Sequence, residues 1–210
     1  MIDAIFFDLG MVLVTFDWEI AVPRFAAHNG GDTERVQQFL AHPLHDAFER
    51  NEISAAEFFH HGCTLMGFQG TPSEFQTYWN EIFAEIPSGV QIVRALSSRI
   101  PLYTLSNTNL WHATYLEEKF DWMNLFTQRF YSFTLGVRKP DTRIYELALA
   151  RANVPPQRAL LIDDRIENIN GARAVGMNAL HASTPKVLQE QVSDIFPHLY
   201  ELQSITEARR

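Results

Sequence analysis

Cysteine is nearly absent from this sequence, because Cys63 is the only one. A single thiol excludes an intrachain disulfide and a metal site built from several thiolates. We expect Cys63 to be a small buried hydrophobic residue. The 210 residues, 46% of them hydrophobic, are enough for one sizeable domain or for a domain that carries an insertion.

Long apolar runs are also missing, so no stretch of about 18 residues predicts a membrane span. The first basic residue is Arg24, and Asp3 and Asp8 interrupt the apolar N-terminal stretch. A secretory signal peptide has the opposite pattern. These features predict a cytoplasmic protein that does not bind a membrane.

Clustered positive charge is the third feature that the sequence lacks. The formal net charge is −8, and Lys and Arg form no cluster beyond the terminal pair Arg209–Arg210. A nucleic-acid groove needs a basic stripe to neutralise phosphates. We therefore expect no nucleic-acid partner.

The first half of the chain contains one strand-like segment and a long helical stretch. Residues 2–8 (IDAIFFD) are rich in Ile and Phe and end before Gly10, which predicts a short buried strand. Residues 16–88 contain aromatic and amphipathic segments separated by turn residues, which predicts four or five helices and no convincing strand. The expected N-caps are Thr33, Ser54 and Ser73, and Ser54 with Glu57 would form a capping box.

After the turn at 87–89, strands and helices alternate. The predicted strands are 101–106, 128–133, 159–163 and 178–182, and the predicted helices are 91–98, 109–119, 142–153, 166–176 and 186–196. This alternation is typical of a parallel sheet with right-handed crossovers. The sequence therefore predicts an α/β fold, a Rossmann-like parallel sheet flanked by helices. Residues 1–15 and 89–210 would form its core domain, and residues 16–88 a helical domain inserted after the first strand.

Chemically specific side chains follow the predicted strands. Asp8 ends the first strand, Ser106–Asn107 ends the next, Lys139 lies in the loop after the third, and Asp163–Asp164 ends the fourth. In open α/β sheets, ligands bind at the carboxyl ends of the strands. Three converging carboxylates repel one another unless a hard cation such as Mg²⁺ lies among them. A lysine and a hydroxyl beside that cation suit the negative oxygens of a phosphoryl group.

Four ordered motifs, FFDLGMVLV, YTLSNTN, VRKPD and LLIDDRIENINGA, resemble those of the haloacid dehalogenase-like hydrolases. Each lies at a predicted strand end, and the helical block lies where family members with a helical cap carry it. The resemblance therefore covers essentially the whole chain. It implies a hydrolase of phosphoric monoesters that uses Mg²⁺ and acts on a small phosphorylated metabolite.

The resemblance also implies a role for each motif residue. Asp8 would be the nucleophile that forms an aspartyl-phosphate, which water then hydrolyses. Ser106 with Asn107 would bind the phosphoryl group, and Lys139 would neutralise both phosphate and nucleophile. The implied Mg²⁺ ligands are Asp8, the backbone carbonyl of Gly10 and Asp164, with Asp163 either a ligand or a support behind the ligands. Asn168 would orient the carboxylate pair.

Gly10 is a departure from the family pattern. Most phosphatases of this superfamily have an aspartate at this position, where it protonates the leaving alkoxide. Loss of a general acid costs on the order of 10²–10⁴ in rate, although a leaving group that departs easily suffers less. The strings DLG, VLV and LSNTN most resemble the branch of the bacterial α-D-glucose-1-phosphate phosphatases and of the N-terminal domains of epoxide hydrolases. Members of the first group also carry glycine here, which favours a sugar phosphate such as glucose 1-phosphate as substrate.

The helical segment is expected to cover the site, exclude water and select the substrate. Its hinges would lie at 15–17 and 87–89. The candidates for lining the site are Phe16, Trp18, His45, Phe48 and Glu49, and His112 follows the phosphate motif closely enough to join them. The sequence leaves a monomer and a homodimer open.

Two other functions stay open at this point. In a 2-haloacid dehalogenase, Asp8 would attack carbon without a metal. The pair Asp163–Asp164 counts against this, as does Gly10, where dehalogenases usually have tyrosine. A non-catalytic member would bind a phosphorylated ligand or a partner protein. Gly10 alone favours that function, and the intact set Asp8, Ser106, Lys139 and Asp164 disfavours it.

Overall fold

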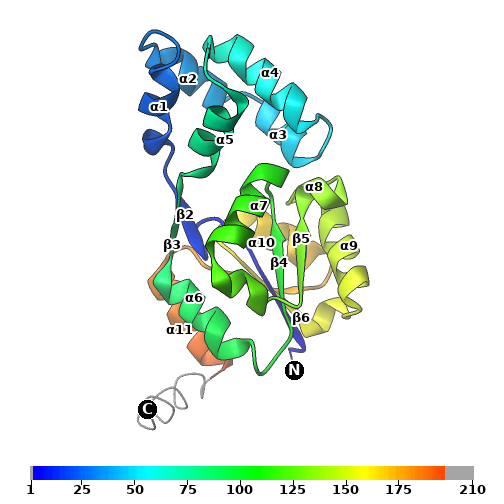
Figure 1. Ribbon diagram of the computed structural model, residues 1–210. Helices are drawn as coiled ribbons and strands as arrows, with labels where there is room; N and C mark the ends of the chain where they lie inside the picture. The colour runs from blue at the N-terminus through cyan, green and yellow to red at the C-terminus, as the bar shows by residue number, and fades with distance from the viewer. Residues whose placement is uncertain (1, 197–210) are drawn as a thin grey trace.

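Five parallel strands form the centre of the larger part of the molecule (Figure 1). The computed structural model describes residues 2–196, so Arg209–Arg210 and the end of the segment 89–210 lie outside the described residues. The strands are β1 (Ala4–Phe7), β4 (Leu102–Ser106), β5 (Gln128–Tyr131), β6 (Ala159–Asp163) and β7 (Asn178–His181). Their order is β5-β4-β1-β6-β7, and all neighbours are parallel. The predicted parallel sheet is confirmed.

Helices cover both faces of this sheet. One face packs against α6 (Pro87–Leu96), α7 (Leu110–Lys119) and α11 (Pro185–Ile195), and the other against α9 (Thr142–Ala152) and α10 (Ile166–Ala174). Successive residues of a strand point to opposite faces, so β1 sends Ile5 and Phe7 to the first core and Ala4 and Phe6 to the second. Because both faces are buried, β1, β4 and β6 are continuous apolar runs. The shorter elements are η2 (Asp121–Leu125), α8 (Ser132–Leu135) and η3 (Pro156–Arg158).

Several element boundaries differ from the prediction by a few residues, and two of these differences have a clear physical reason. Helix α6 begins at Pro87, because proline suits the first helical position. The first turn of α6 packs closely against the turn after β1 because Gly89 has no side chain. A Cβ at Gly89 would lie 2.3 Å from the Val12 carbonyl oxygen. The predicted strand 128–133 ends early, since α8 begins at Ser132, whose hydroxyl exchanges hydrogen bonds with the Thr108 backbone at 3.0 and 2.9 Å.

A separate group of helices, which we call the cap helices (residues 18–80), follows β1 along the chain. They are η1 (Trp18–Ile20), α1 (Val22–Ala26), α2 (Thr33–Leu40), α3 (Leu44–Glu49), α4 (Ala55–Met66) and α5 (Pro72–Asn80). They enclose an aromatic core of their own that includes Phe58, Phe75 and Trp79. Cys63, which we expected to be buried, is only partly buried against this core.

The N-caps of the cap helices are partly as predicted. The capping box of Ser54 and Glu57 is confirmed, with the Ser54 N–H donating to Glu57 Oε2 at 2.7 Å. The predicted caps Thr33 and Ser73 are wrong. Asp32 caps α2, and Thr71 caps α5 in a second capping box with Glu74. In each case the true cap is the residue whose side chain reaches the N–H three positions on.

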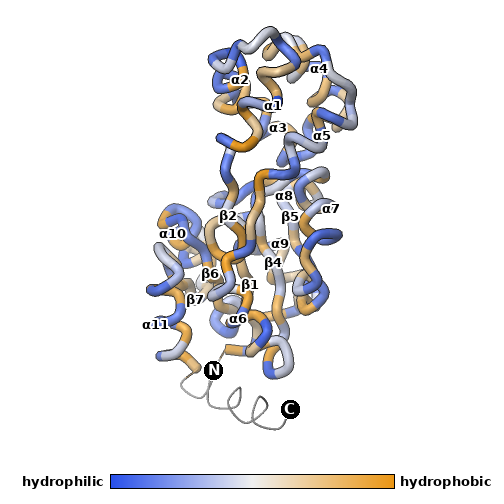
Figure 2. Tube along the Cα trace, turned by 60° about the vertical axis from the view of Figure 1, so that its left-hand side comes forward, coloured by the Kyte–Doolittle hydropathy of each residue, from blue (hydrophilic) through white to orange (hydrophobic). Residues whose placement is uncertain are grey.

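Two short strands that the sequence did not indicate join the cap helices to the sheet (Figures 1 and 2). Strand β2 (Val14–Phe16) pairs antiparallel with β3 (Phe83–Glu85), with Phe16 opposite Phe83. The expectation that 16–88 contains no strand is therefore wrong at both ends of that segment. Each strand has three residues, too few to show an alternating pattern, and the partners lie 69 positions apart.

The cap helices contact the end of the sheet where the strands finish. Helix α5 contacts α7, and α3 contacts α8. In Figure 1 the cap helices lie above these two helices, beyond the carboxyl ends of the strands. The fold thus encloses the loops after β1, β4 and β6 between sheet and cap. Within residues 2–196, no helix is long and apolar enough to cross a membrane.

Candidate active site

The polar residues predicted at the strand ends meet on one wall of a cavity between the sheet and the cap helices. The cavity has a volume of about 490 Å³. The predicted residues on its wall are Asp8, Gly10, Ser106, Asn107, Lys139, Asp164 and Asn168. Asp163 is fully buried behind this wall. The structure therefore brings these predicted residues together at one cavity.

A buried lysine joins two carboxylates at the centre of this wall. Asp8 follows β1 directly, and its N–H donates to the Ile162 carbonyl of β6 at 2.9 Å. The Nζ atom of Lys139 lies 3.1 Å from Asp8 Oδ1 and donates to Asp163 Oδ2 at 2.6 Å. The Lys139 side chain is fully buried. The carboxylate of Asp8, which follows an apolar strand, is thus paired with Lys139, which lies in a loop 131 positions further along the chain.

The same burial shifts the pKa values of these groups. Burial raises the pKa of Asp8 to about 7, and Lys139 opposes this rise while Asp163 and Asp164 add to it. Burial alone would lower the pKa of Lys139, but the carboxylates of Asp8 and Asp163 outweigh it and raise the pKa. Burial and the charge of Asp163 raise the pKa of Asp164. The site therefore holds more negative charge than one lysine neutralises.

Asp163 is held by several donors at once. Its Oδ1 accepts from the Arg165 N–H at 2.9 Å, and both its oxygens accept from Asn168 Nδ2, at 2.9 and 3.1 Å. With Lys139 on Oδ2, each oxygen has two donors. Asp164 instead reaches the cavity, while its backbone carbonyl accepts from His181 Nε2 at 2.8 Å. The two adjacent aspartates are thus placed differently, one as a fixed support and one toward the cavity.

Asn107 connects the loop after β4 to the loop that carries Lys139. Its Nδ2 donates to the Lys139 carbonyl at 2.9 Å, and its Oδ1 accepts the Lys139 N–H at 2.7 Å. Both ends of the amide are therefore used on the lysine backbone. Ser106, buried at the end of β4, is the hydroxyl that lines the cavity beside it.

Asp8, Asp163 and Asp164 form a cluster suited to a cation. Each offers a carboxylate oxygen, and these oxygens all lie within 4.8 Å of one another. Hard divalent cations such as Mg²⁺ prefer oxygen ligands of this kind. In the turn after β1, the Leu9 carbonyl accepts hydrogen bonds from the N–H groups of Leu13 and Val14. These bonds do not involve the Gly10 carbonyl. The donor set fits a divalent cation.

The rest of the cavity wall comes mainly from the cap helices, the β2–β3 ribbon and α7. Of the residues predicted to line it, Phe16, Trp18, His45, Glu49 and His112 do so. Phe48 does not, because it packs inside the aromatic core of the cap helices. The sequence analysis missed several apolar members of this wall, namely Met11, Leu40, Ile82 and Phe83. Their apolar character gave no signal that distinguishes a cavity wall from a core.

Arg138 is a cavity residue to which the sequence analysis assigned no role. It precedes Lys139, lines the cavity, and forms ion pairs with Asp46 and with Glu49 of α3, the latter at 2.7 Å. Burial raises the pKa of Glu49, and Arg138 opposes that rise. The motif VRKPD contains the arginine, but its partners lie about 90 positions earlier in the chain.

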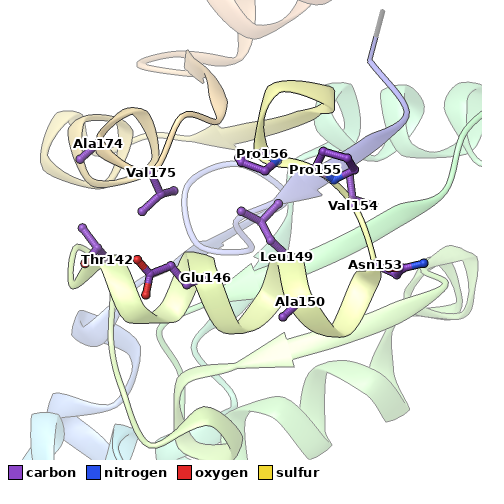
Figure 3. A pocket seen from close by; sticks show the side chains of 10 residues that line it. All are labelled: Thr142, Glu146, Leu149, Ala150, Asn153, Val154, Pro155, Pro156, Ala174 and Val175. Carbon is purple, nitrogen blue, oxygen red and sulfur yellow. The ribbon is translucent and has the colours of Figure 1, made fainter.

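A second hollow, of about 680 Å³, lies between α9, the segment 154–156 and the end of α10 (Figure 3). Glu146 is the one titratable side chain among the described residues that line it. This hollow includes Pro156 of η3, the element that precedes β6. The hollow therefore lies toward the opposite end of the sheet from Asp8. Its described lining therefore lacks a cluster of carboxylates and cations like that around Asp8.

The chain is similar to several known proteins. The family model "haloacid dehalogenase-like hydrolase" matches residues 2–176. The chain is 27% identical over 184 residues to D-ribitol-5-phosphate phosphatase of Bacteroides thetaiotaomicron, which covers 84% of this chain and 89% of that protein. It is 28% identical over 141 residues to the sesquiterpene phosphatase astK of Aspergillus oryzae, and the match covers 65% of this chain and 70% of that protein.

The fold is also shared with solved structures. An enzyme of the same family from Bacteroides thetaiotaomicron, in complex with magnesium and inorganic phosphate, has a TM-score of 0.74 at 22% identity, over 86% of this chain and 94% of that one. Identity at this level shows a common fold. With the family model spanning most of the chain, the protein belongs to the haloacid dehalogenase-like hydrolases.

Proposed function

We propose that this hydrolase is a Mg²⁺-dependent phosphatase of small phosphomonoesters that works through an aspartyl-phosphate on Asp8. The observation that carries the proposal is the cluster around Asp8: a buried lysine 3.1 Å away and two further carboxylates whose oxygens lie within 4.8 Å. A nucleophilic carboxylate, a fixed cation and a divalent-metal site together suit phosphoryl transfer.

The residues that would hold Mg²⁺ are Asp8, Asp164 and the Gly10 carbonyl, supported by Asp163. When bound, the ion would offset the carboxylate charge and polarise the phosphoryl oxygens. Asp163 fits the supporting role because both its oxygens already accept two hydrogen bonds each. Asn168 holds that carboxylate in place, as its motif position implies.

The remaining residues orient the phosphoryl group and balance its charge. A carboxylate oxygen of Asp8 attacks phosphorus, the bond from phosphorus to the leaving oxygen breaks, and water then hydrolyses the aspartyl-phosphate. Lys139 faces both the nucleophile and the incoming phosphoryl oxygens. The Ser106 hydroxyl binds those oxygens, and Asn107 contributes through its backbone N–H, because its side chain holds the Lys139 backbone.

The substrate we propose is a phosphorylated sugar or polyol, with glucose 1-phosphate as one candidate. The cavity of about 490 Å³ lies within the range typical of small-molecule sites. The relative named D-ribitol-5-phosphate phosphatase supports this class. We further propose that residues 16–88 act as a cap domain over a catalytic domain of residues 1–15 and 89–210.

The test is a screen of phosphorylated metabolites and 2-chloropropionate with and without EDTA. It compares the wild type with Asp8→Asn and with the control Asp121→Asn, whose side chain is largely exposed at a surface ion pair. We expect phosphate release that EDTA abolishes, loss of activity in Asp8→Asn, and normal activity in the control. Phosphate release that survived in Asp8→Asn would refute the nucleophile assignment. Chloride release insensitive to EDTA would identify a dehalogenase instead.

A further inference from the structure

We propose that Phe16 contacts the leaving group, and that within the phosphorylated sugars the protein prefers those whose leaving oxygen departs without a proton from the protein, as an anomeric oxygen does, and whose ring offers a flat apolar face. This inference rests on the function proposed above. It assigns to one residue of the β2–β3 ribbon the specificity for the half of the substrate that the Asp8 cluster does not bind.

The side-chain direction of Gly10 points at the ring of Phe16. A Cβ atom added at Gly10 would lie 3.4 Å from Phe16 Cε1 and 3.9 Å from Cδ1. The ring is held there because Phe16 pairs with Phe83 across the ribbon, with the two rings edge to face at a centroid distance of 6.4 Å. The Cβ of an aspartate at position 10 would thus be in van der Waals contact with the ring, and its carboxyl group would have to lie beside the ring.

In-line displacement places the leaving oxygen opposite Asp8, away from the cavity floor. Phe16 of the β2–β3 ribbon lines the same cavity as Asp8, so we place the leaving group against this ring. Phe16 is 42% exposed and Met11, which also lines the cavity, is 45% exposed, although both are large apolar side chains. Carbon surface left open at the mouth of a polar site is suited to an apolar part of the substrate.

The histidines of the cavity wall are not placed to protonate a leaving group. His112 donates from Nε2 to the Trp79 carbonyl at 3.0 Å and accepts at Nδ1 from Asn109 Nδ2 at 3.1 Å, so both nitrogens are engaged. His45 donates from Nε2 to the Phe39 carbonyl at 2.9 Å, so its Nδ1 carries only a lone pair. Burial lowers the pKa of His45 to about 4, which keeps the ring neutral.

The carboxyl groups of the wall are engaged as well. Glu49 is ion-paired with Arg138 at 2.7 Å, Asp164 belongs to the carboxylate cluster, and Asp8 itself forms the new bond. Among the described residues that line the cavity, each carboxyl and imidazole group thus already belongs to an ion pair, a hydrogen bond or the carboxylate cluster. When the phosphorus–oxygen bond breaks, its electron pair stays on the leaving oxygen, which departs as the anion and takes its proton from water.

The first experiment measures kcat and KM for a series of substituted phenyl phosphates and for cyclohexyl phosphate, with wild type, Phe16→Ala and Phe16→Tyr. We expect kcat/KM of the wild type to fall steeply as the pKa of the leaving alcohol rises. Phe16→Ala should raise KM for the phenyl phosphates about 3- to 10-fold, the range of an aromatic contact, and Phe16→Tyr should restore it. Equal losses for phenyl and cyclohexyl phosphate in Phe16→Ala would overturn the role of the ring.

The second experiment introduces the missing acid. Gly10→Asp alone should gain no activity toward cyclohexyl phosphate, whereas Gly10→Asp with Phe16→Ala should flatten the dependence on leaving-group pKa. Gly10→Ala and circular dichroism control for effects of the backbone and of folding. A gain in Gly10→Asp with Phe16 intact would refute the inference. Activity that survived in Asp8→Asn would instead refute the proposed function, so the two failures are distinguishable.

Discussion

At the scale of single residues, Lys139 determines the electrostatics of the site. Its side chain is fully buried and lies within 3.1 Å of Asp8 and 2.6 Å of Asp163. A buried charge is costly to leave without a partner, and here one cation offsets two carboxylates. Lys139 is thus needed for the folded state as well as for the proposed chemistry.

Replacing this lysine should affect both properties. We expect Lys139→Met to lower kcat/KM for phosphomonoesters at least 100-fold and to reduce the free energy of unfolding by about 3–5 kcal/mol at pH 8. In Lys139→Met the pKa of Asp8, already raised by burial, should rise further because the neighbouring cation is gone. The Asp8 carboxyl of the variant then takes up a proton as the pH falls toward 5, so the stability loss should shrink. Urea denaturation in EDTA measures this, with the exposed Lys186→Met as control. A pH-independent loss would contradict the electrostatic explanation.

At the scale of elements, an ion-pair group and a hydrogen bond are among the contacts between the cap helices and the part of the molecule that contains the sheet. Arg138, from the loop after α8, pairs with Asp46 and Glu49 of α3. His112 of α7 donates to the carbonyl of Trp79 in α5. Both contacts lie beside the cavity, so they couple the position of the cap helices to the geometry of the site.

Loss of the Arg138 pair should loosen the cap helices without unfolding the sheet. Arg138 and Glu49 are about one-fifth exposed and Asp46 is half exposed, so we expect Arg138→Gln to weaken the contact of the cap helices with the sheet by about 1 kcal/mol, a roughly 5-fold loss in kcat/KM. Hydrogen exchange should accelerate in α3 and remain unchanged in β1 and β6. The control is Arg94→Gln, which breaks an exposed ion pair of 2.7 Å elsewhere. Uniform acceleration across the protein would show a general loss of stability instead.

The contact between α7 and α5 should make the protein sensitive to mild acid. Burial lowers the pKa of His112 to about 3, below the value of about 6.5 in an unfolded chain. Protons therefore bind preferentially to the unfolded state, and the free energy of unfolding falls as the pH drops below 6.5. From pH 7 to pH 5 this histidine should contribute a loss of about 2 kcal/mol. We expect a smaller pH slope in His112→Gln; parallel slopes for the two proteins would contradict the assignment.

At the scale of the whole molecule, a divalent cation should stabilise the fold. It would bind carboxylates that β1 and β6 bring together, and these groups are far apart in an unfolded chain. A ligand at 100 times its dissociation constant that binds only the folded state adds about 2.7 kcal/mol. We expect Mg²⁺ to raise the thermal midpoint of the wild type and of Asp194→Asn, an exposed control, but not of Asp164→Asn. Equal shifts in all three proteins would place the ion elsewhere.

Much of this organisation could be predicted from the sequence. Strand β6 was predicted at its observed bounds, Ala159–Asp163, because a short, continuous apolar run between turn residues is a distinctive sequence pattern of a fully buried strand. The caps Asp32 and Thr71 were missed by one and two positions, since several capping residues lie in a row at each site. The ribbon of β2 and β3 was missed because neither strand is long enough to show a pattern alone.

The sequence by itself determined the sheet, the helical insertion and the residues at the strand ends, because periodicity and motif order are local properties. Only the tertiary structure decided what meets across the cavity. Arg138 pairs with α3, Phe48 turns into the cap core, and the ring of Phe16 covers the side-chain direction of Gly10. These contacts join segments far apart in the chain, and which of them form depends on how the cap helices pack on the sheet.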